Sequence, residues 1–166
     1  MTRKNKFLGY IFIVVGVLSL LAMGILERLE QKEIVRNHVA SLPSFSILSI
    51  HGNLTRLEVK DKPVVLFFFH STCEHCQEEA KYVVEHRQKL QSADVYFLST
   101  ENLADIQKFA QNYQLHPFQV GQVKDEEVSV PMGIRTFPTC FVYAKSGVLL
   151  KQFQGQIKID AITALF

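Results

Sequence analysis

The sequence has no tryptophan, only three cysteines, and no large excess of charge of either sign. Three cysteines are too few for a disulfide-rich scaffold, and the odd number leaves at least one of them outside any internal pair. The 166 residues carry a formal net charge of +2, which gives no support for nucleic-acid binding. Apolar residues make up 48% of the chain, which is a high share for a chain with 20% charged residues. The length allows one domain of ordinary size and an additional segment.

Much of the apolar content lies in a single N-terminal run. Residues 7–26, from Phe7 to Leu26, include no charged residue. A helix of this length, at about 1.5 Å per residue, crosses a hydrocarbon core of roughly 30 Å. Basic residues before the run favour a cytoplasmic N-terminus and export of the chain that follows. We therefore expect a single transmembrane anchor, or signal-anchor, at 7–26, preceded by a cytoplasmic basic tip at 1–6.

A cleaved signal peptide is the alternative interpretation of the same run. Ala22 and Gly24 are small residues one position apart, a spacing that fits a cleavage site weakly. The run is longer than the usual apolar core of a signal peptide, which favours retention as an anchor. Both interpretations place the rest of the chain in a periplasmic or other extracytoplasmic compartment. The charged segment at 27–41 is predicted to be a helical stalk, which Pro43 ends.

From residue 42 onwards the pattern alternates between strands and helices. Residues 64–69 form an uninterrupted apolar run, typical of a central strand covered on both faces. A strand–helix–strand order requires a parallel pair with a crossover, and a later hairpin adds antiparallel strands. We therefore predict an α/β domain over 42–166, a three-layer sandwich with a mixed β-sheet flanked by helices. The strands are expected at 45–50, 54–59, 64–69, 94–99, 118–123, 139–143 and 148–153, and the helices at 76–90, 102–113 and 157–166.

The chemistry is expected at Cys73-Glu74-His75-Cys76, which follows the buried strand and opens a helix. Two cysteines three positions apart in a first helical turn can bring their sulfurs within bonding distance. Unpaired N–H groups and the partial positive charge at a helix N-terminus favour thiolate over thiol. Cys73, nearer the helix tip, is predicted to be the exposed nucleophile. Cys76 is predicted to resolve the mixed disulfide.

These features resemble the thioredoxin superfamily, and more closely its membrane-anchored TlpA-like branch. The resemblance covers about residues 42–166 and depends on three segments, 42–47, 62–69 and 133–139. It implies a thioredoxin-like fold and a cis Phe137–Pro138 bond beside Cys73. It also implies that the backbone around Phe137 pairs with a substrate chain in a strand-like way, so that Thr136, Phe137 and Pro138 bind substrate.

Two more residues near the cysteines are candidates for catalysis. Glu79 lies one turn after Cys76, and the resemblance implies that it accepts a proton near the buried thiol, a role that suits a partly buried carboxylate. A solvated helix glutamate is the alternative. His75 is expected to stabilise the Cys73 thiolate, whereas Glu74 acts against it, so we expect an intermediate redox potential. An exposed histidine of little effect is the alternative for His75.

The sequence thus predicts a membrane-tethered thiol–disulfide oxidoreductase with protein thiols or disulfides as substrates. No cofactor is expected beyond the redox-active disulfide Cys73–Cys76, and no metal. A membrane or extracytoplasmic redox partner is expected, and the reductive direction is slightly favoured. Peroxidase activity is disfavoured because the Pro-x-x-x-Thr-x-x-Cys pattern of peroxiredoxins is missing.

A copper or zinc carrier is the alternative function. Two thiolates and two imidazoles, from His70, Cys73, His75 and Cys76, are a plausible ligand set for Cu(I) or zinc. The two-residue gap between the cysteines and the predicted cis-proline segment favour redox work instead. Cys140 follows Pro138 in an apolar strand and is predicted to be a buried small hydrophobic residue rather than a third redox partner.

Overall fold

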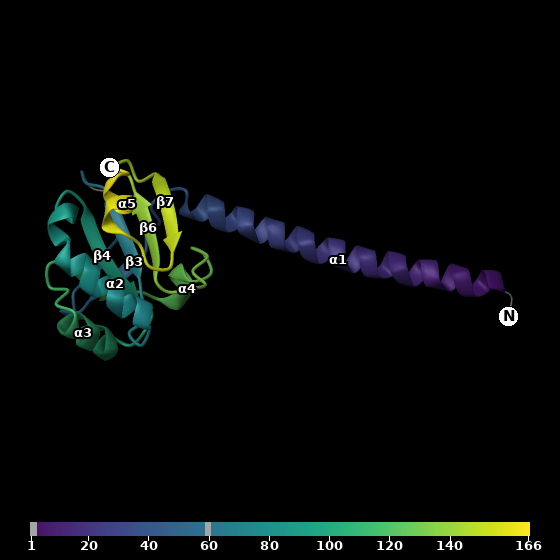
Figure 1. Ribbon diagram of the computed structural model, residues 1–166, viewed down its shortest axis with the longest axis horizontal. Coiled ribbons are helices and arrows are strands. Elements are labelled where there is room, and N and C mark those ends of the chain that lie inside the picture. The colour runs from purple at the N-terminus through teal and green to yellow at the C-terminus, as the bar shows by residue number, and fades with distance from the viewer. Residues whose placement is uncertain (1–2, 59–60) are drawn as a thin grey trace. The chain divides into compact units, whose positions relative to one another are not determined.

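The structure is a computed structural model that describes residues 3–58 and 61–166 (Figure 1). The chain divides into two compact units, one up to Arg36 and one from Asn37 to Phe166. Helix α1 spans Arg3–Val39 and continues through most of the predicted stalk. From Ile13 to Leu26 its side chains are exposed.

The predicted anchor has no confirmation in the structure. Among the described residues, no helix combines the length and the apolar character needed to span a membrane. The side chains of residues 1–12 lie outside the described set. The predicted tip at 1–6 and the first part of the predicted anchor at 7–26 therefore fall outside this finding, and the anchor stays a prediction.

The second unit is built on a seven-stranded sheet in the order β2-β1-β5-β4-β3-β6-β7. Strand β3 pairs in parallel with β4, which pairs in parallel with β5, and every other pairing in the sheet is antiparallel. The sheet is mixed, as predicted, and all seven expected strands are present. Their bounds are β1 Ser46–Ser49, β2 Leu54–Arg56, β3 Val64–Phe68, β4 Asp94–Ser99, β5 Gln119–Gln122, β6 Thr139–Tyr143 and β7 Leu149–Gln154.

The helices agree with the prediction in order but not in all bounds. The helix predicted at 76–90 begins earlier and is shorter: α2 spans Glu74–Glu85, and a 3-10 turn follows at Arg87–Leu90. His86 leaves helical geometry, and its Nδ1 donates to the Tyr82 carbonyl at 2.9 Å. The short helix α4, Asp125–Val128, was not predicted. The remaining helices are α3, Leu103–Asn112, and α5, Ile159–Thr163.

Strand β3 lies at the centre of the fold because both of its faces are covered. Val65 and Phe67 belong to one buried apolar cluster, and Leu66 and Phe68 belong to the other. The ring of Phe67 stacks on Phe97 of β4, with centroids 4.9 Å apart. This packing holds the strand rigidly, and the predicted active-site segment follows its carboxyl end.

Candidate active site

The turn between β3 and α2 places Cys73 at the start of the helix. The Cys73 N–H donates to the His70 carbonyl at 3.1 Å, which closes the turn 70–72. Cys73 is the N-cap residue of α2, and its Sγ accepts the Cys76 N–H at 3.4 Å. A sulfur in this position takes the place of the capping oxygen and lies where the helix dipole favours negative charge. All three cysteines are free thiols in this structure.

The predicted substrate segment lies beside Cys73. The Phe137–Pro138 peptide bond is cis, as the resemblance implied. The Cys73 thiol lies 3.7 Å from the Phe137 carbonyl oxygen, to which it donates. Thr136 is exposed, Phe137 is half-buried, and the Thr136 carbonyl accepts the Thr139 hydroxyl at 2.6 Å. The structure therefore brings residues 136–138 next to the more accessible cysteine.

Cys76 has a different environment from Cys73. It is 2% exposed and belongs to the same apolar cluster as Val65 and Phe67. Burial raises the pKa of the Cys76 thiol far above its usual range, and the hydrogen bond with Cys73 adds to this effect. Cys76 therefore needs a nearby base to become a nucleophile.

Glu79 is a buried carboxyl close enough to affect both buried thiols. It is 4% exposed, and burial raises its pKa to about 8, against which a hydrogen bond from the Ile157 backbone acts. That N–H donates to Oε1 of Glu79 at 3.2 Å. The solvated alternative for Glu79 is therefore wrong. Its charge contributes to the raised pKa values of Cys76 and Cys140, although burial is the largest cause in both.

Cys140 and His75 complete the residues that the sequence singled out. Cys140 is fully buried in β6 opposite Phe67, as predicted. The His75 side chain is 70% exposed, and its Nδ1 lies 4.0 Å from the carboxylate of Glu78. In the part of the chain that the structure describes, no hydrogen bond joins His75 to either cysteine. The structure brings the other predicted site residues together and leaves His75 at the surface.

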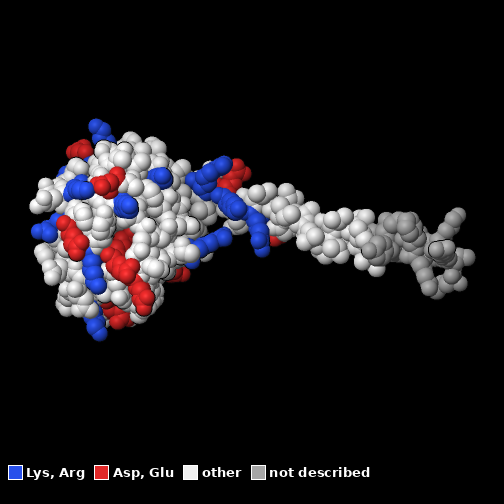
Figure 2. Space-filling model, viewed as in Figure 1, with Lys and Arg blue, Asp and Glu red and all other residues white. Residues whose placement is uncertain are grey.

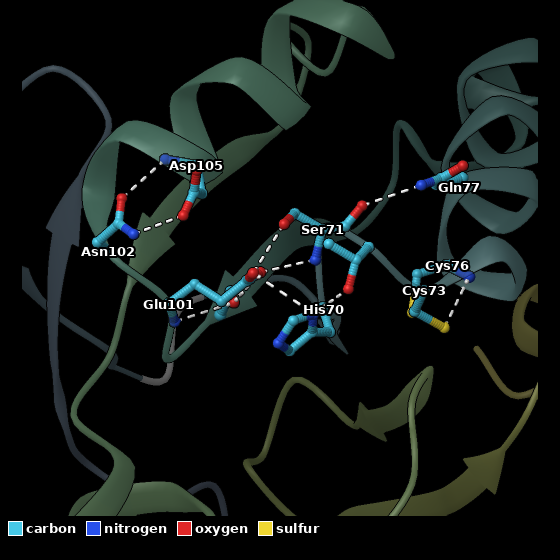
Figure 3. Close-up of polar contacts among 10 residues, drawn as sticks. His70, Ser71, Cys73, Cys76, Gln77, Glu101, Asn102 and Asp105 are labelled. Atoms are coloured by element: carbon cyan, nitrogen blue, oxygen red, sulfur yellow. Dashed lines mark hydrogen bonds and ion pairs between the residues drawn. The ribbon is translucent and has the colours of Figure 1, made fainter.

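A polar network around the turn 70–72 was not predicted (Figure 3). Its centre is Glu101, which follows β4 and whose side chain is 12% exposed. Glu101 accepts hydrogen bonds from the N–H and the hydroxyl of Ser71, at 2.6 and 2.7 Å. The available signal was a charged residue two positions after a buried strand, at the sheet edge where parallel strands β3 and β4 both end.

The metal alternative has no ligand set in the ranges described. Within residues 3–58 and 61–166, no three His, Cys, Asp or Glu side chains are grouped so that they could hold a metal ion. The His70 ring instead has Thr72 and Glu101 as neighbours, at 3.0 and 3.4 Å from Nδ1.

A cavity of about 750 Å³ lies between the β1–β2 hairpin, α3 and β5, and its lining includes none of the predicted site residues.

Comparisons with known proteins place this chain among thiol–disulfide oxidoreductase relatives and thioredoxin-like structures. A thiol-disulfide oxidoreductase ResA from Bacillus thuringiensis subsp. konkukian (strain 97-27) is 24% identical over 160 residues, covering 93% of this chain and 91% of the relative. Among solved structures, the exposed lipoprotein thioredoxin Etrx1 from Streptococcus pneumoniae strain TIGR4 has a TM-score of 0.64 and 23% identity, over 74% of this chain and 97% of its own. A peroxiredoxin-like protein from Aquifex aeolicus also has a TM-score of 0.64, at 12% identity, over 76% and 85% of the two chains.

The two solved structures support the thioredoxin-like fold alone, whereas the curated relative carries the activity class that the sequence predicted. The family model for AhpC/TSA matches residues 40–152, which include both cysteines, Glu79 and the cis-proline segment. This chain therefore belongs to the AhpC/TSA family, within the thioredoxin superfamily.

Proposed function

We propose that this protein is a membrane-tethered thiol–disulfide oxidoreductase that exchanges disulfides with extracytoplasmic proteins through Cys73-Glu74-His75-Cys76. One observation carries the proposal. A half-buried Cys73 caps α2 beside the Phe137 carbonyl, and a buried Cys76 lies one turn behind it near a carboxyl with a pKa of about 8. One sulfur is accessible to a substrate, and the other is protected until a mixed disulfide forms.

The first step in the reductive direction uses Cys73. Its thiolate attacks one sulfur of a substrate disulfide, which breaks the substrate S–S bond and forms a mixed disulfide with Cys73. The other substrate sulfur leaves as a thiolate and takes a proton. Residues 136–138 line the approach to Cys73, so that an extended substrate chain can lie along them.

The second step uses Cys76 and Glu79. Cys76 loses its proton to ionised Glu79, and the resulting thiolate attacks the Cys73 sulfur. The Cys73–Cys76 disulfide forms, and the second substrate sulfur leaves as a thiolate and is protonated. Two electrons have passed from the cysteine pair to the substrate, and a thiol donor on the same side of the membrane must reduce the pair again.

With a pKa of about 8, Glu79 suits this proton transfer. Near neutral pH it is mostly protonated, and a minority of molecules hold the ionised base. In the oxidative direction the protonated form donates to the Cys76 thiolate as the disulfide opens. A carboxyl with a pKa near the working pH can serve both directions.

The tether is part of the proposal. Residues 7–26 would anchor the chain, with residues 1–6 in the cytoplasm and the stalk at 27–41 leading to the catalytic domain at 42–166 on the far side. The uncharged composition of 7–26 supports this arrangement.

In the drawn face of Figure 2, the second unit shows acidic and basic side chains interspersed, which gives no sign of a nucleic-acid surface.

The proposal is tested by an equilibrium redox titration of the full chain in detergent against glutathione buffers, scored by thiol alkylation. We expect a reversible two-electron transition that Cys73→Ala abolishes. A potential near about −270 mV supports a reductant, and one approaching roughly −120 mV supports an oxidant. A chain whose Cys73 and Cys76 never form a reversible disulfide would contradict the proposal. Carbonate extraction of cell membranes tests the tether, since a spanning helix keeps the chain in the pellet.

A further inference from the structure

Glu101 holds the turn that leads to Cys73, although it lies 30 positions along the chain from Ser71. Oε2 accepts the Ser71 N–H at 2.6 Å, and Oε1 accepts the Ser71 hydroxyl at 2.7 Å (Figure 3). The Ser99 hydroxyl donates to Oε2 at 3.1 Å. The side chain of Gln122 on β5 donates to the Glu101 carbonyl at 2.8 Å, which ties the backbone of Glu101 to the sheet.

The turn 70–72, held by Glu101, contacts both cysteines. The His70 carbonyl accepts the Cys73 N–H at 3.1 Å. Burial raises the pKa of Cys76, and a hydrogen bond from the His70 backbone acts in the opposite direction. The side chain of Gln77 on α2 donates to the Ser71 carbonyl at 3.0 Å, so the turn is fastened to the helix as well as to Glu101.

We infer that Glu101 is a positioning residue for the cysteine pair. Its carboxylate fixes Ser71, and through Ser71 it fixes the turn that sets the Cys73 backbone and reaches the Cys76 sulfur. The inference rests on the proposed function, since it concerns the step in which Cys76 attacks Cys73. That step requires two sulfurs held in line, and small misplacements of reacting atoms are costly.

A carboxylate fits this place better than an amide. Three donors converge on the two oxygens: the N–H and hydroxyl of Ser71 and the hydroxyl of Ser99. An ionised carboxylate is an acceptor at both oxygens, whereas a glutamine presents an NH₂ group at one of them. Glu101→Gln therefore keeps the size of the side chain, but it replaces charge-assisted hydrogen bonds with neutral ones and requires the Ser71 hydroxyl to accept instead of donate.

Positioning and simple charge predict opposite results for Glu101→Gln. If Glu101 acted only through its charge, removing a negative charge near the pair would favour the Cys73 thiolate and speed its alkylation. If Glu101 positions the turn, alkylation of Cys73 by a small reagent changes little, because that reagent needs no second sulfur. The displacement of a bound thiol by Cys76 slows instead.

The experiment uses the full chain in detergent, charged with glutathione on Cys73, and follows glutathione release by stopped flow. For Glu101→Gln we expect release to slow by about tenfold to a hundredfold, while iodoacetamide alkylation of Cys73 stays within about threefold of wild type. Asp105→Asn is the matched control. Asp105 is an exposed residue at the start of α3 whose carboxylate accepts from the Asn102 side-chain amide, and replacing it should leave release unchanged.

Ser71→Ala gives an independent measurement that does not depend on whether Glu101→Gln folds. It removes one of the two donors from Ser71 and should slow release by about threefold to tenfold. The double variant should lose less than the product of the two single losses, because both act through the same contact.

A release rate at the wild-type level in Glu101→Gln or, if that variant does not fold, in Ser71→Ala overturns the inference. The proposed function survives that result as long as Cys73→Ala abolishes the redox transition. Faster alkylation with unchanged release also overturns it and assigns Glu101 a charge effect only. A wild-type chain that forms no internal disulfide overturns both proposals.

Discussion

Glu79 and Glu101 are both withdrawn from solvent near one cysteine pair, yet their surroundings differ. Glu79 is buried in α2 one turn after Cys76, and among the described residues one backbone N–H, that of Ile157, donates to its carboxylate. Glu101 lies after β4, and three donors from two serines converge on its oxygens. Burial with few donors raises the pKa of Glu79 to about 8, so this carboxyl can exchange a proton near neutral pH.

The comparison separates two uses of a carboxylate at an active site. A carboxyl in an apolar pocket is available for proton transfer because its neutral form is stabilised. A carboxylate can instead accept hydrogen bonds from the backbone and hydroxyls of a turn. Its lone pairs are then occupied, and it holds the turn in position. In the two proposals both carboxylates act on catalysis through Cys76, Glu79 by taking its proton and Glu101 by positioning the turn 70–72.

The largest expected effect comes from removing the Cys76 sulfur, on which the proposed roles of both carboxylates depend. Cys76→Ser should stop turnover, with a loss of at least about a thousandfold, and a mixed disulfide on Cys73 should accumulate. The measurement is reduction of a protein disulfide, with mass spectrometry of the trapped species. In this background, Glu79→Gln and Glu101→Gln should have no additional effect. Cys140→Ala is the matched cysteine control and should keep turnover.

The next largest effect is on stability, and it concerns Glu79 alone. Its folded pKa is raised from 4.5 to about 8, so the folded state binds the proton more tightly than the unfolded state. That contribution to stability is complete below about pH 4.5 and is lost as the pH rises through 8. At pH 9 we expect Glu79→Gln to be more stable than wild type by roughly 3 to 5 kcal/mol, and close to wild type at pH 4.

Urea unfolding of both proteins at pH 4, 7 and 9 measures this difference. Glu78→Gln is the matched control, because Glu78 is the next residue but its side chain is 64% exposed. The control should show no such gain at pH 9. A parallel decline of wild type and Glu79→Gln with rising pH would show that Glu79 is not a buried proton carrier.

The third effect is on the rate of the resolving step and distinguishes the two carboxylates directly. In wild type, glutathione release from Cys73 should speed up with pH and flatten above about 8, as Glu79 ionises. Glu79→Gln should lose this rise and slow release by about a hundredfold at pH 8. Glu101→Gln should slow release at every pH and keep the inflection. Stopped-flow traces from pH 5 to 9.5 test this, and exchanged pH profiles would reverse the two assignments.

The smallest effect is expected at His75, which lies between the cysteines in sequence but at the surface in space. Because its side chain is 70% exposed, its charge is well screened by solvent. His75→Ala should shift the redox potential by less than about 30 mV, which corresponds to less than a tenfold change in the equilibrium constant. The same titration that tests the proposed function measures it. A larger shift would show that an exposed imidazole affects the pair more than the buried network does.

The central strand and the cysteine pair could be predicted because their signals are local. The run from Val64 to Phe68 is apolar at every position, and the structure buries all five residues. Cys73 and Cys76 lie within the first turn of the helix after this strand, and helix geometry alone brings the Cys76 N–H to the Cys73 sulfur. The cis bond before Pro138 was anticipated from the resemblance, and its contact with Cys73 followed from the same source.

Two differences from the prediction, the role of Glu101 and the end of α2, depend on side-chain contacts that periodicity does not reveal. Glu101 meets Ser71 only because β3 and β4 lie in parallel register, with Phe68 opposite Leu98, so that both strands end at one edge. The end of α2 depends on His86, whose ring bonds back to the Tyr82 carbonyl, a choice that helical periodicity does not reveal. His75 lies between the two cysteines in sequence, yet its side chain is 70% exposed, and its effect on the Cys73 thiolate stays a prediction.

The sequence by itself determined the fold class, the strand order of the central βαβ unit and the position of the two close cysteines at the start of a helix. These depend on periodicity, on apolar runs and on residue spacing within one helical turn. Only the tertiary structure decided the environments of the two carboxylates. Whether a glutamate keeps a proton or holds a turn depends on desolvation and on donors supplied by other elements, here Ile157 for Glu79 and Ser71 for Glu101. Neither property is encoded in the residues next to it along the chain.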